Sequence, residues 1–165
     1  MIFSPSFSLQ GRLDLSWNRL GASLKDLFTT EWTSTNLYEL TLTGCDVTRG
    51  VLDSIAECPN LPHLTKLRLD QNNLSGGRKK AALIRCVGRM ESTLKYLDVS
   101  SCALTKGDVV DVCSVLLNFN HLQHLVVYPN GEVTVEVVRD ELLPMLKGLP
   151  CLRCFPPLDS LECEP

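Results

Sequence analysis

Leucine recurs at fixed places along this chain, and the recurrence limits what the chain can fold into. The clearest copy begins at Leu64: leucine fills its first, fourth, sixth and eleventh places and Asn72 fills the ninth, giving L-x-x-L-x-L-x-x-N-x-L. Four more copies align with it, and the five units begin near residues 10, 37, 64, 94 and 122. Steps of 27 to 30 residues are typical of a stack in which each unit buries its apolar side against its neighbours.

Each unit predicts a short strand followed by a helix. The strand lies at the start of the unit, and the segment after it has apolar residues three or four apart, as at Leu52, Ile55 and Ala56. Strands joined through a helix lie parallel, and the crossover is right-handed. The sequence therefore predicts an α/β fold: a right-handed solenoid forming a short horseshoe arc, with a parallel sheet on its concave side and helices on its convex side.

The whole chain of 165 residues is predicted to be one domain. It divides into an N-terminal cover at residues 1–9, five repeats over residues 10–148 and a degenerate C-terminal cap at residues 149–165. The cap begins like a sixth repeat, but Pro156 and Pro157 remove backbone donors that a further strand needs. We therefore expect the stack to end there.

The ninth place alternates strictly between two residue types, in the order Asn18, Cys45, Asn72, Cys102 and Asn130. In this alternation the chain resembles the ribonuclease-inhibitor class of leucine-rich repeat proteins, which recurs in the sensor regions of NOD-like receptors. The resemblance covers about residues 10 to 150, and residues 128–131, which read as a tight turn, depart from the pattern. It implies a non-catalytic recognition module in innate immunity, with a protein or microbial surface ligand. The alternative is an intracellular protein inhibitor or scaffold.

The fixed period identifies the side chains that leave the concave face. Aromatic residues stand there among charged and hydroxyl groups, and tyrosine, tryptophan and arginine are enriched at binding hot spots. The candidate ligand-binding residues are Trp17, Tyr38, Thr41, Lys66, Arg68, Asp70, Tyr96, Asp98, His124 and Tyr128.

The plainer alternative for this face is a solvated sheet. Arg68 would lie beside Asp98, and Lys66 beside Glu39, as exposed cross-strand ion pairs of little energetic weight. Asp70, flanked by Thr43 and Ser100 on the neighbouring strands, could orient a sugar or a peptide amide or remain a hydrated carboxylate. Both interpretations stay open from the sequence.

Composition and motifs argue against several other classes of function. A net charge of -3 gives no overall attraction to nucleic acid. No run of about 18 apolar residues predicts a membrane span, and no secretory leader is visible, so we expect a cytoplasmic protein, or an extracellular one if a leader has been removed. His124 is the only histidine of the face, and the segment 75–80 lacks the spacing of a phosphate loop. We therefore expect neither catalysis, nor a cofactor, nor a metal.

Eight cysteines are many for this length. Five fall in or near the repeating core, where cysteine acts as a small apolar residue: Cys45, Cys58, Cys86, Cys102 and Cys113. Cys151, Cys154 and Cys163 crowd the C-terminal end, where a disulfide-stapled cap is one interpretation. The pair Cys151 and Cys154 has no nearby histidine or second close pair, which argues against zinc.

Both ends of the predicted stack rely on irregular apolar covers. Phe3 and Phe7 are available at one end, and Phe155, Leu158 and Leu161 at the other. Apolar ends of this kind favour contact with a second copy. We therefore expect a homodimer through one end.

Overall fold

The computed structural model describes residues 11–28, 37–58, 61 and 63–152. Its strands form one open parallel sheet in chain order, as the repeat predicts. They are β1 (Gly11–Asp14), β2 (Leu37–Thr41), β3 (Lys66–Arg68), β4 (Tyr96–Asp98) and β5 (His124–Val126). Each strand begins within two residues of the unit start read from the sequence.

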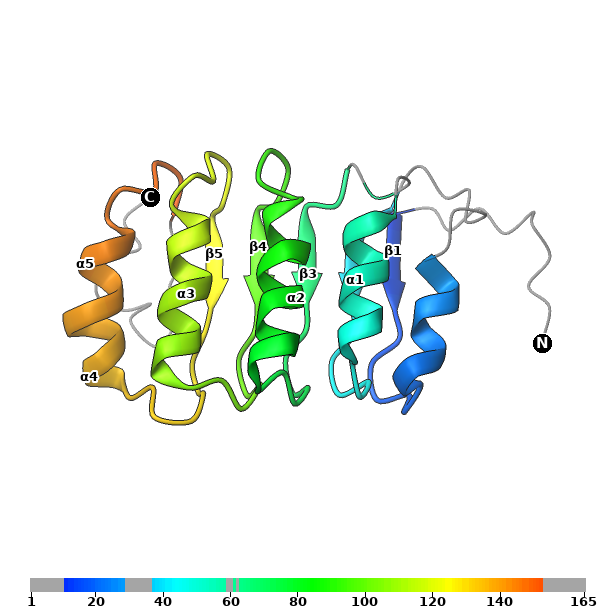
Figure 1. Ribbon diagram of the computed structural model, residues 1–165. Coiled ribbons are helices and arrows are strands. Elements are labelled where there is room, and N and C mark those ends of the chain that lie inside the picture. The colour runs from blue at the N-terminus through cyan, green and yellow to red at the C-terminus, as the bar shows by residue number, and fades with distance from the viewer. Residues whose placement is uncertain (1–10, 29–36, 59–60, 62, 153–165) are drawn as a thin grey trace.

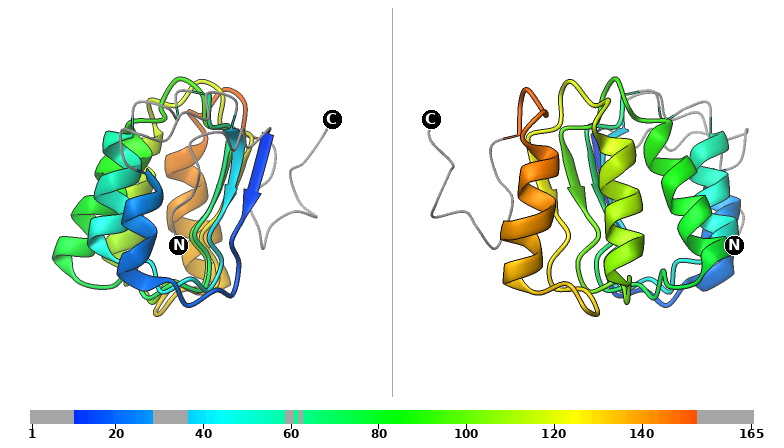
Figure 2. Two further views of the ribbon diagram at one scale, coloured as in Figure 1. Left: turned by 90° about the vertical axis from the view of Figure 1, so that its right-hand side faces the viewer. Right: turned by 60° about the vertical axis from the view of Figure 1, so that its left-hand side comes forward.

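A helical segment follows every strand. These segments are η1 (Gly21–Phe28, a 3-10 helix), α1 (Arg49–Glu57), α2 (Gly77–Gly88), α3 (Lys106–Leu116) and a last run of α4 (Val135–Val137), η2 (Val138–Leu142) and α5 (Leu143–Leu146). All of them lie on one face of the sheet, and no helix of the described residues lies over the other face (Figures 1 and 2). This arrangement confirms the α/β class and the repeating strand–helix unit.

The register of the sheet keeps equivalent places of the repeat side by side. The fourth-place leucines form one row across the strands, from Leu13 through Leu40, Leu67 and Leu97 to Leu125. The last four of these side chains are fully buried. Because burying one leucine contributes about 1.5–3 kcal/mol, this row and the matching sixth-place row fix which face of the sheet is covered. The prediction that these places point to the core is confirmed.

The helices bury the apolar faces that their spacing predicts. In α1, Leu52, Ile55 and Ala56 are buried. A capping box begins α3: Thr105 accepts a bond from the Asp108 N–H, and the Asp108 carboxylate accepts one from the Thr105 N–H. Such caps satisfy amides at the helix start that have no partner within the helix.

The last helical run contains one turn of π-helix. Pro144 has no N–H and cannot continue the ordinary hydrogen-bond ladder, and the preceding N–H, of Leu143, donates to the Val138 oxygen five residues back. Val138 and Leu142 remain buried, as their spacing predicts.

The ninth-place asparagines of the third and fifth repeats, Asn72 and Asn130, each join their repeat to the one before it. The Asn72 side-chain oxygen accepts from the amides of Cys45, at 3.0 Å, and Val47, at 2.9 Å. Its side-chain nitrogen donates to the carbonyls of Leu42, at 2.8 Å, and of Leu69, at 2.7 Å. One buried amide therefore satisfies backbone groups of two adjacent turns that no strand or helix pairs.

Asn130, in the fifth unit, makes the equivalent set of bonds. Its oxygen accepts from the amides of Cys102 and Leu104, at 2.8 and 3.2 Å, and its nitrogen donates to the carbonyls of Val99 and Val127. The tight turn predicted over residues 128–131 lies around it, and the Asn130 carbonyl accepts from the amide of Val133. The fifth unit thus keeps the ninth-place bonds despite its unusual turn.

The core cysteines are buried thiols, as predicted. Cys45, Cys58, Cys86, Cys102 and Cys113 are all buried. Desolvation raises the pKa of Cys86, Cys102 and Cys113 to about 12. Cys151 is a partly exposed free thiol, whereas Cys154 and Cys163 lie outside the described residues, as do Phe3, Phe7, Phe155, Leu158 and Leu161.

Candidate functional site

The side of the sheet opposite the helices, here called the open face, carries the side chains of the third, fifth and seventh places. The parallel register places equivalent residues of all five strands in rows across it. Neighbouring strands lie about 4.8 Å apart, so side chains in one row can touch. The open face is therefore a set of rows that cross the strands.

The third-place row is Arg12, Glu39, Lys66, Tyr96 and His124. Glu39 lies between two cations, with Oε2 3.0 Å from Arg12 Nε and Oε1 2.8 Å from Lys66 Nζ. Lys66 Nζ lies 5.0 Å from the centroid of the Tyr96 ring, a cation–π distance. The Tyr96 and His124 ring centroids are 5.8 Å apart. Each member of the row thus contacts the next across the whole sheet.

A second cluster lies around Arg68, on the neighbouring rows. Arg68 Nε is 3.4 Å from Asp70 Oδ1, and Arg68 Nη2 is 3.6 Å from Asp98 Oδ2. Thr43 donates to Asp70 Oδ1 at 2.8 Å, and Ser100 donates to Asp98 Oδ1 at 2.7 Å. Each carboxylate is thus held by a hydroxyl and faces the same guanidinium.

This cluster corrects one sequence expectation. Asp70 and Asp98 are only 5% and 4% exposed, and Thr41 is 6% exposed, so none of the three presents much surface to a ligand. Short side chains in a closely spaced sheet are covered by longer neighbours: Arg68 lies between Thr41 and Asp98 in the sheet, and its guanidinium also faces Asp70. Asp70 is therefore not a hydrated carboxylate. The two carboxylates hold Arg68 in place instead.

Two aromatic rings on the β1–β2 side depend on glycine. Trp17 is 65% exposed and Tyr38 is 42% exposed. A Cβ on Gly44 would come within 2.6 Å of the Trp17 ring, and one on Gly11 within 2.7 Å of the Tyr38 ring. The rings can therefore lie against the backbone only because these positions lack a side chain. Tyr38 also accepts a hydrogen bond from Arg12 Nε at 3.0 Å.

Tyr96 lies on β4, between Lys66 and His124 in the third-place row. Burial, more than its charged neighbours, raises the pKa of the Tyr96 phenol above its ordinary value. The phenol therefore stays neutral in neutral solution, and its O–H points to Asp98 Oδ2 at 3.5 Å. Tyr96 thus joins the third-place row to the Arg68 cluster.

Tyr128 lies apart from this central group. It lines a shallow cleft of about 520 Å³ formed by the loops that follow β4 and β5, together with Ser101, Ala103, Pro129 and residues 133–136. The sequence predicted one surface for all ten candidates. Contacts in the structure link six of them, namely Lys66, Arg68, Asp70, Tyr96, Asp98 and His124. Trp17 and Tyr38 lie toward the β1 edge, and Thr41 is buried.

Four residues outside the candidate set organise the face. Arg12 and Glu39 continue the third-place row to the edge strand, and Thr43 and Ser100 hold the two carboxylates. All four occupy the same outward places of the repeat as the candidates. The period places all four on this face, and the choice of candidates by residue type left them out of the predicted site.

Within residues 11–28, 37–58, 61 and 63–152, no three histidine, cysteine or acidic side chains are grouped so that they could bind a metal ion. Over the same residues, no helix is long and apolar enough to cross a membrane.

A sequence model described as Leucine Rich repeat matches residues 92–113. The matched segment contains β4 and most of α3, that is, the strand and helix of the fourth unit. No curated protein matches the chain. The match, together with five equivalent strand–helix units in register, supports a leucine-rich repeat protein. Leucine-rich repeats generally mediate contacts between proteins, which agrees with a binding module.

Proposed function

We propose that the chain is a short ribonuclease-inhibitor-type solenoid, with the open face as its concave side, and that it binds a protein partner there without catalysing a reaction. The observation that carries the proposal is the third-place row, a continuous series of contacting charged and aromatic side chains across all five strands. We propose Trp17, Tyr38, Lys66, Arg68, Tyr96 and His124 as the contact residues and Asp70 and Asp98 as the groups that position Arg68.

The row is arranged before any partner arrives. Glu39 pairs with two cations that would otherwise sample many rotamers, and Tyr96 lies between Lys66 and His124. A surface ordered in advance loses less side-chain entropy on binding. Ion pairs this exposed contribute only about 0–1 kcal/mol to folding, so stability alone gives little reason to keep the row.

A narrower proposal follows from the alternation of asparagine and cysteine at the ninth place. Its resemblance to the sensor regions of NOD-like receptors favours innate immune recognition, with a microbial surface component as a second class of ligand. The same resemblance supports the alternative, an intracellular inhibitor or scaffold that clamps one protein. These roles predict different partners and are separated by experiment.

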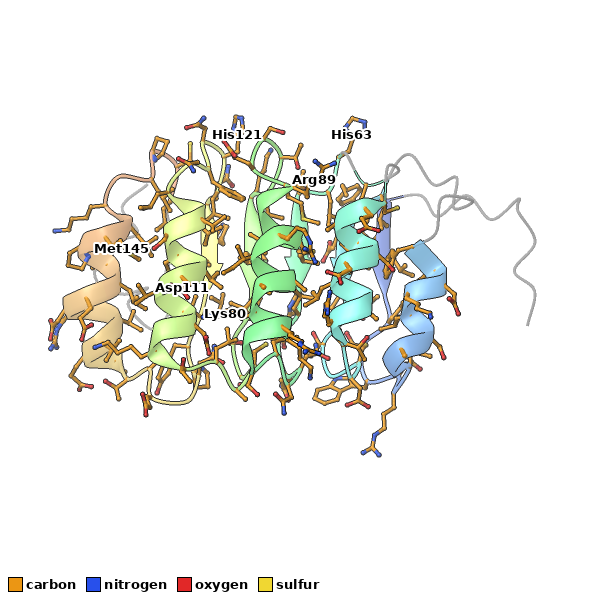
Figure 3. The ribbon with its side chains drawn as sticks, in the orientation of Figure 1. His63, Lys80, Arg89, Asp111, His121 and Met145 are labelled. Carbon is orange, nitrogen blue, oxygen red and sulfur yellow. The ribbon has the colours of Figure 1, made fainter. Side chains whose placement is uncertain are left out.

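The test compares the whole chain with two matched variants. Lys66→Ala removes a cation on the open face, and Lys80→Ala removes one on the helix face, where Lys80 pairs with Asp111 at the same 2.8 Å (Figure 3). Each immobilised protein is exposed to host lysate and, separately, to whole bacteria, and the bound material is quantified by mass spectrometry. We expect a partner that Lys80→Ala retains and that Lys66→Ala loses by about tenfold.

Capture from lysate alone indicates an intracellular partner, and capture of bacteria alone indicates a microbial ligand. If every bound species responds equally to the two lysine variants, and Tyr96→Ala also changes nothing, the open face is not the binding surface.

A further inference from the structure

The loops that follow β4 and β5 form a cleft that the third-place row does not use. The cleft has a volume of about 520 Å³. Ser101 and Ala103 line it from the first loop, and Tyr128 and residues 129–136 line it from the second and from the start of α4. This volume lies in the range of about 300–1,000 Å³ that is common for ligand pockets. The cleft can therefore admit a side chain of a partner.

The walls of the cleft are fixed by contacts between the two loops. The Ser101 amide donates to the Pro129 carbonyl, and Asn130 Oδ1 accepts from the Leu104 amide at 3.2 Å. A Cβ on Gly131 would come within 2.7 Å of the Leu104 carbonyl oxygen, so the second loop lies directly against the first. A site that is already formed loses little conformational entropy when a ligand binds.

Much of the cleft lining is apolar. Tyr128 and Val135 are half-buried and pack against the core, and Val133 is buried. Such a lining can cover the hydrocarbon stem of a long side chain. The ring of Tyr128 also attracts a cation that lies within about 6 Å of its centroid.

The charge of the cleft is negative. Glu136 is the one charged residue among the described residues that line it, and it is exposed. A hydrogen bond from the Thr134 hydroxyl lowers the pKa of Glu136, so the carboxylate is ionised in neutral solution. Within the described part of the chain Glu136 forms no ion pair, and Arg139, in the next turn, pairs with Asp140 at 2.7 Å. The cleft therefore offers an uncompensated carboxylate beside an apolar wall.

This combination selects the chemistry of the ligand. An anion would be repelled by Glu136, and a purely apolar group would remove water from the carboxylate without replacing its hydrogen bonds. A long side chain with a cationic end satisfies both parts of the cleft. Arginine fits better than lysine, because its planar guanidinium stacks on aromatic rings and is less strongly hydrated than an ammonium group.

We propose that the cleft binds an arginine side chain of a partner protein. The hydrocarbon stem lies along Tyr128 and Val135, and the guanidinium donates to the Glu136 carboxylate. That the arginine belongs to a protein rests on the proposed function, whereas the preference of the cleft for arginine does not. The cleft and the third-place row share no residue, so either can fail without the other.

The preference is tested with two tripeptides that differ only in charge. One is acetyl-glycyl-arginyl-glycine amide, and in the other the arginine is replaced by citrulline, which has nearly the same shape and is neutral. Each is titrated into the isotope-labelled whole chain and followed by amide chemical shifts. We expect the amides of Ser101, Gly131 and Glu136 to shift, with a millimolar dissociation constant for the arginine peptide. The citrulline peptide binds about threefold more weakly, as an exposed ion pair predicts.

Matched variants identify the groups that provide this preference. Glu136→Gln keeps the shape of the side chain and lowers the affinity for the arginine peptide by about threefold, while the affinity for the citrulline peptide stays the same. Glu141→Gln is the control, because it removes the same charge from the same helical run outside the cleft lining. Tyr128→Leu weakens the arginine peptide by about threefold, and Tyr128→Phe retains it.

The preference for arginine is overturned if the two peptides bind equally, if the shifts lie elsewhere in the chain, or if Glu136→Gln leaves the arginine peptide unaffected. An affinity for the corresponding lysine peptide equal to or above that for the arginine peptide also overturns it. The spectra of the variants show directly whether each has kept its fold.

The origin of the arginine is tested by capture from host lysate. We expect Glu136→Gln to reduce the amount of the captured partner by about threefold relative to Glu141→Gln. Equal capture by the two variants overturns the assignment to a protein. Capture of nothing by any variant contradicts both this assignment and the proposed function, whereas the peptide titrations still decide whether the cleft binds arginine.

Discussion

The first and third repeats have nearly the same sequence pattern and very different surroundings. Leu67, Leu69 and Leu74 of the third repeat are fully buried, while the equivalent Leu13 and Leu15 are half-buried and Leu20 is exposed. The ninth-place asparagine of the third repeat bonds to two turns of the chain, and that of the first bonds only to its own. Burial in this architecture therefore depends on having neighbours on both sides.

The comparison separates two contributions to the structure of a repeat: the turn that ends its strand and the core that it shares with its neighbours. The bonds of Asn18 to Leu15 and Ser16 show that the turn at the end of a strand forms within one unit. The burial of Leu67, by contrast, needs Leu40 on one side and Leu97 on the other. Local turn geometry is thus a property of the unit, and core stability is a property of the contact between units.

The largest expected effect is a loss of core volume at an interior unit. Leu67→Ala should lower the free energy of unfolding by about 3 kcal/mol, because a fully buried leucine leaves a cavity among packed neighbours. Leu13→Ala, in the same row at the edge, should cost about 1 kcal/mol, because its site is already partly open. Urea unfolding followed by circular dichroism measures both. Equal losses would show that the edge unit is as well packed as the interior.

The second effect concerns the ninth place. Asn72→Ala leaves the amides of Cys45 and Val47 buried without an acceptor, which should cost about 2 kcal/mol or more. Asn18→Ala removes only bonds that water can replace and should cost less than about 1 kcal/mol. Thermal or urea unfolding of the two variants checks this ratio. A loss at Asn18 as large as that at Asn72 would contradict the comparison.

Much of the fold could be predicted from the sequence, because a period with one residue type per place specifies both the register and the buried face. The rows of Leu40, Leu67 and Leu97 follow from it directly. The candidate site could be predicted less well. Residue type indicates which side chains are polar, but the burial of Asp70 depends on where the neighbouring Arg68 extends. That direction is set by contacts between units, which the pattern does not encode.

A third effect comes from the core thiols. In the unfolded chain a cysteine loses its proton near pH 9, but burial raises the pKa of Cys86, Cys102 and Cys113 to about 12 in the folded protein. The unfolded state then binds fewer protons than the folded state between these values. The free energy of unfolding should therefore fall as pH rises past 9, by about 1 kcal/mol per thiol per pH unit.

Unfolding by urea at pH 8, 9 and 10 measures this slope, and Cys113→Ala is the control that should reduce it. The same thiols should resist an alkylating reagent in the folded protein, whereas the partly exposed Cys151 should react first. An unchanged slope in Cys113→Ala would show that other groups cause the pH dependence.

The smallest expected effect on stability lies on the open face. Lys66→Ala breaks the pair with Glu39 and the contact with the Tyr96 ring, yet it should change the free energy of unfolding by less than about 1 kcal/mol, because the pair is partly exposed. Lys80→Ala, which breaks a pair of the same length between α2 and α3, should behave alike. Urea unfolding of both variants measures the two changes in the free energy of unfolding. A large loss at Lys66 alone would mean that the third-place row holds the strands together, and the argument that the row is there for binding would lose its main support.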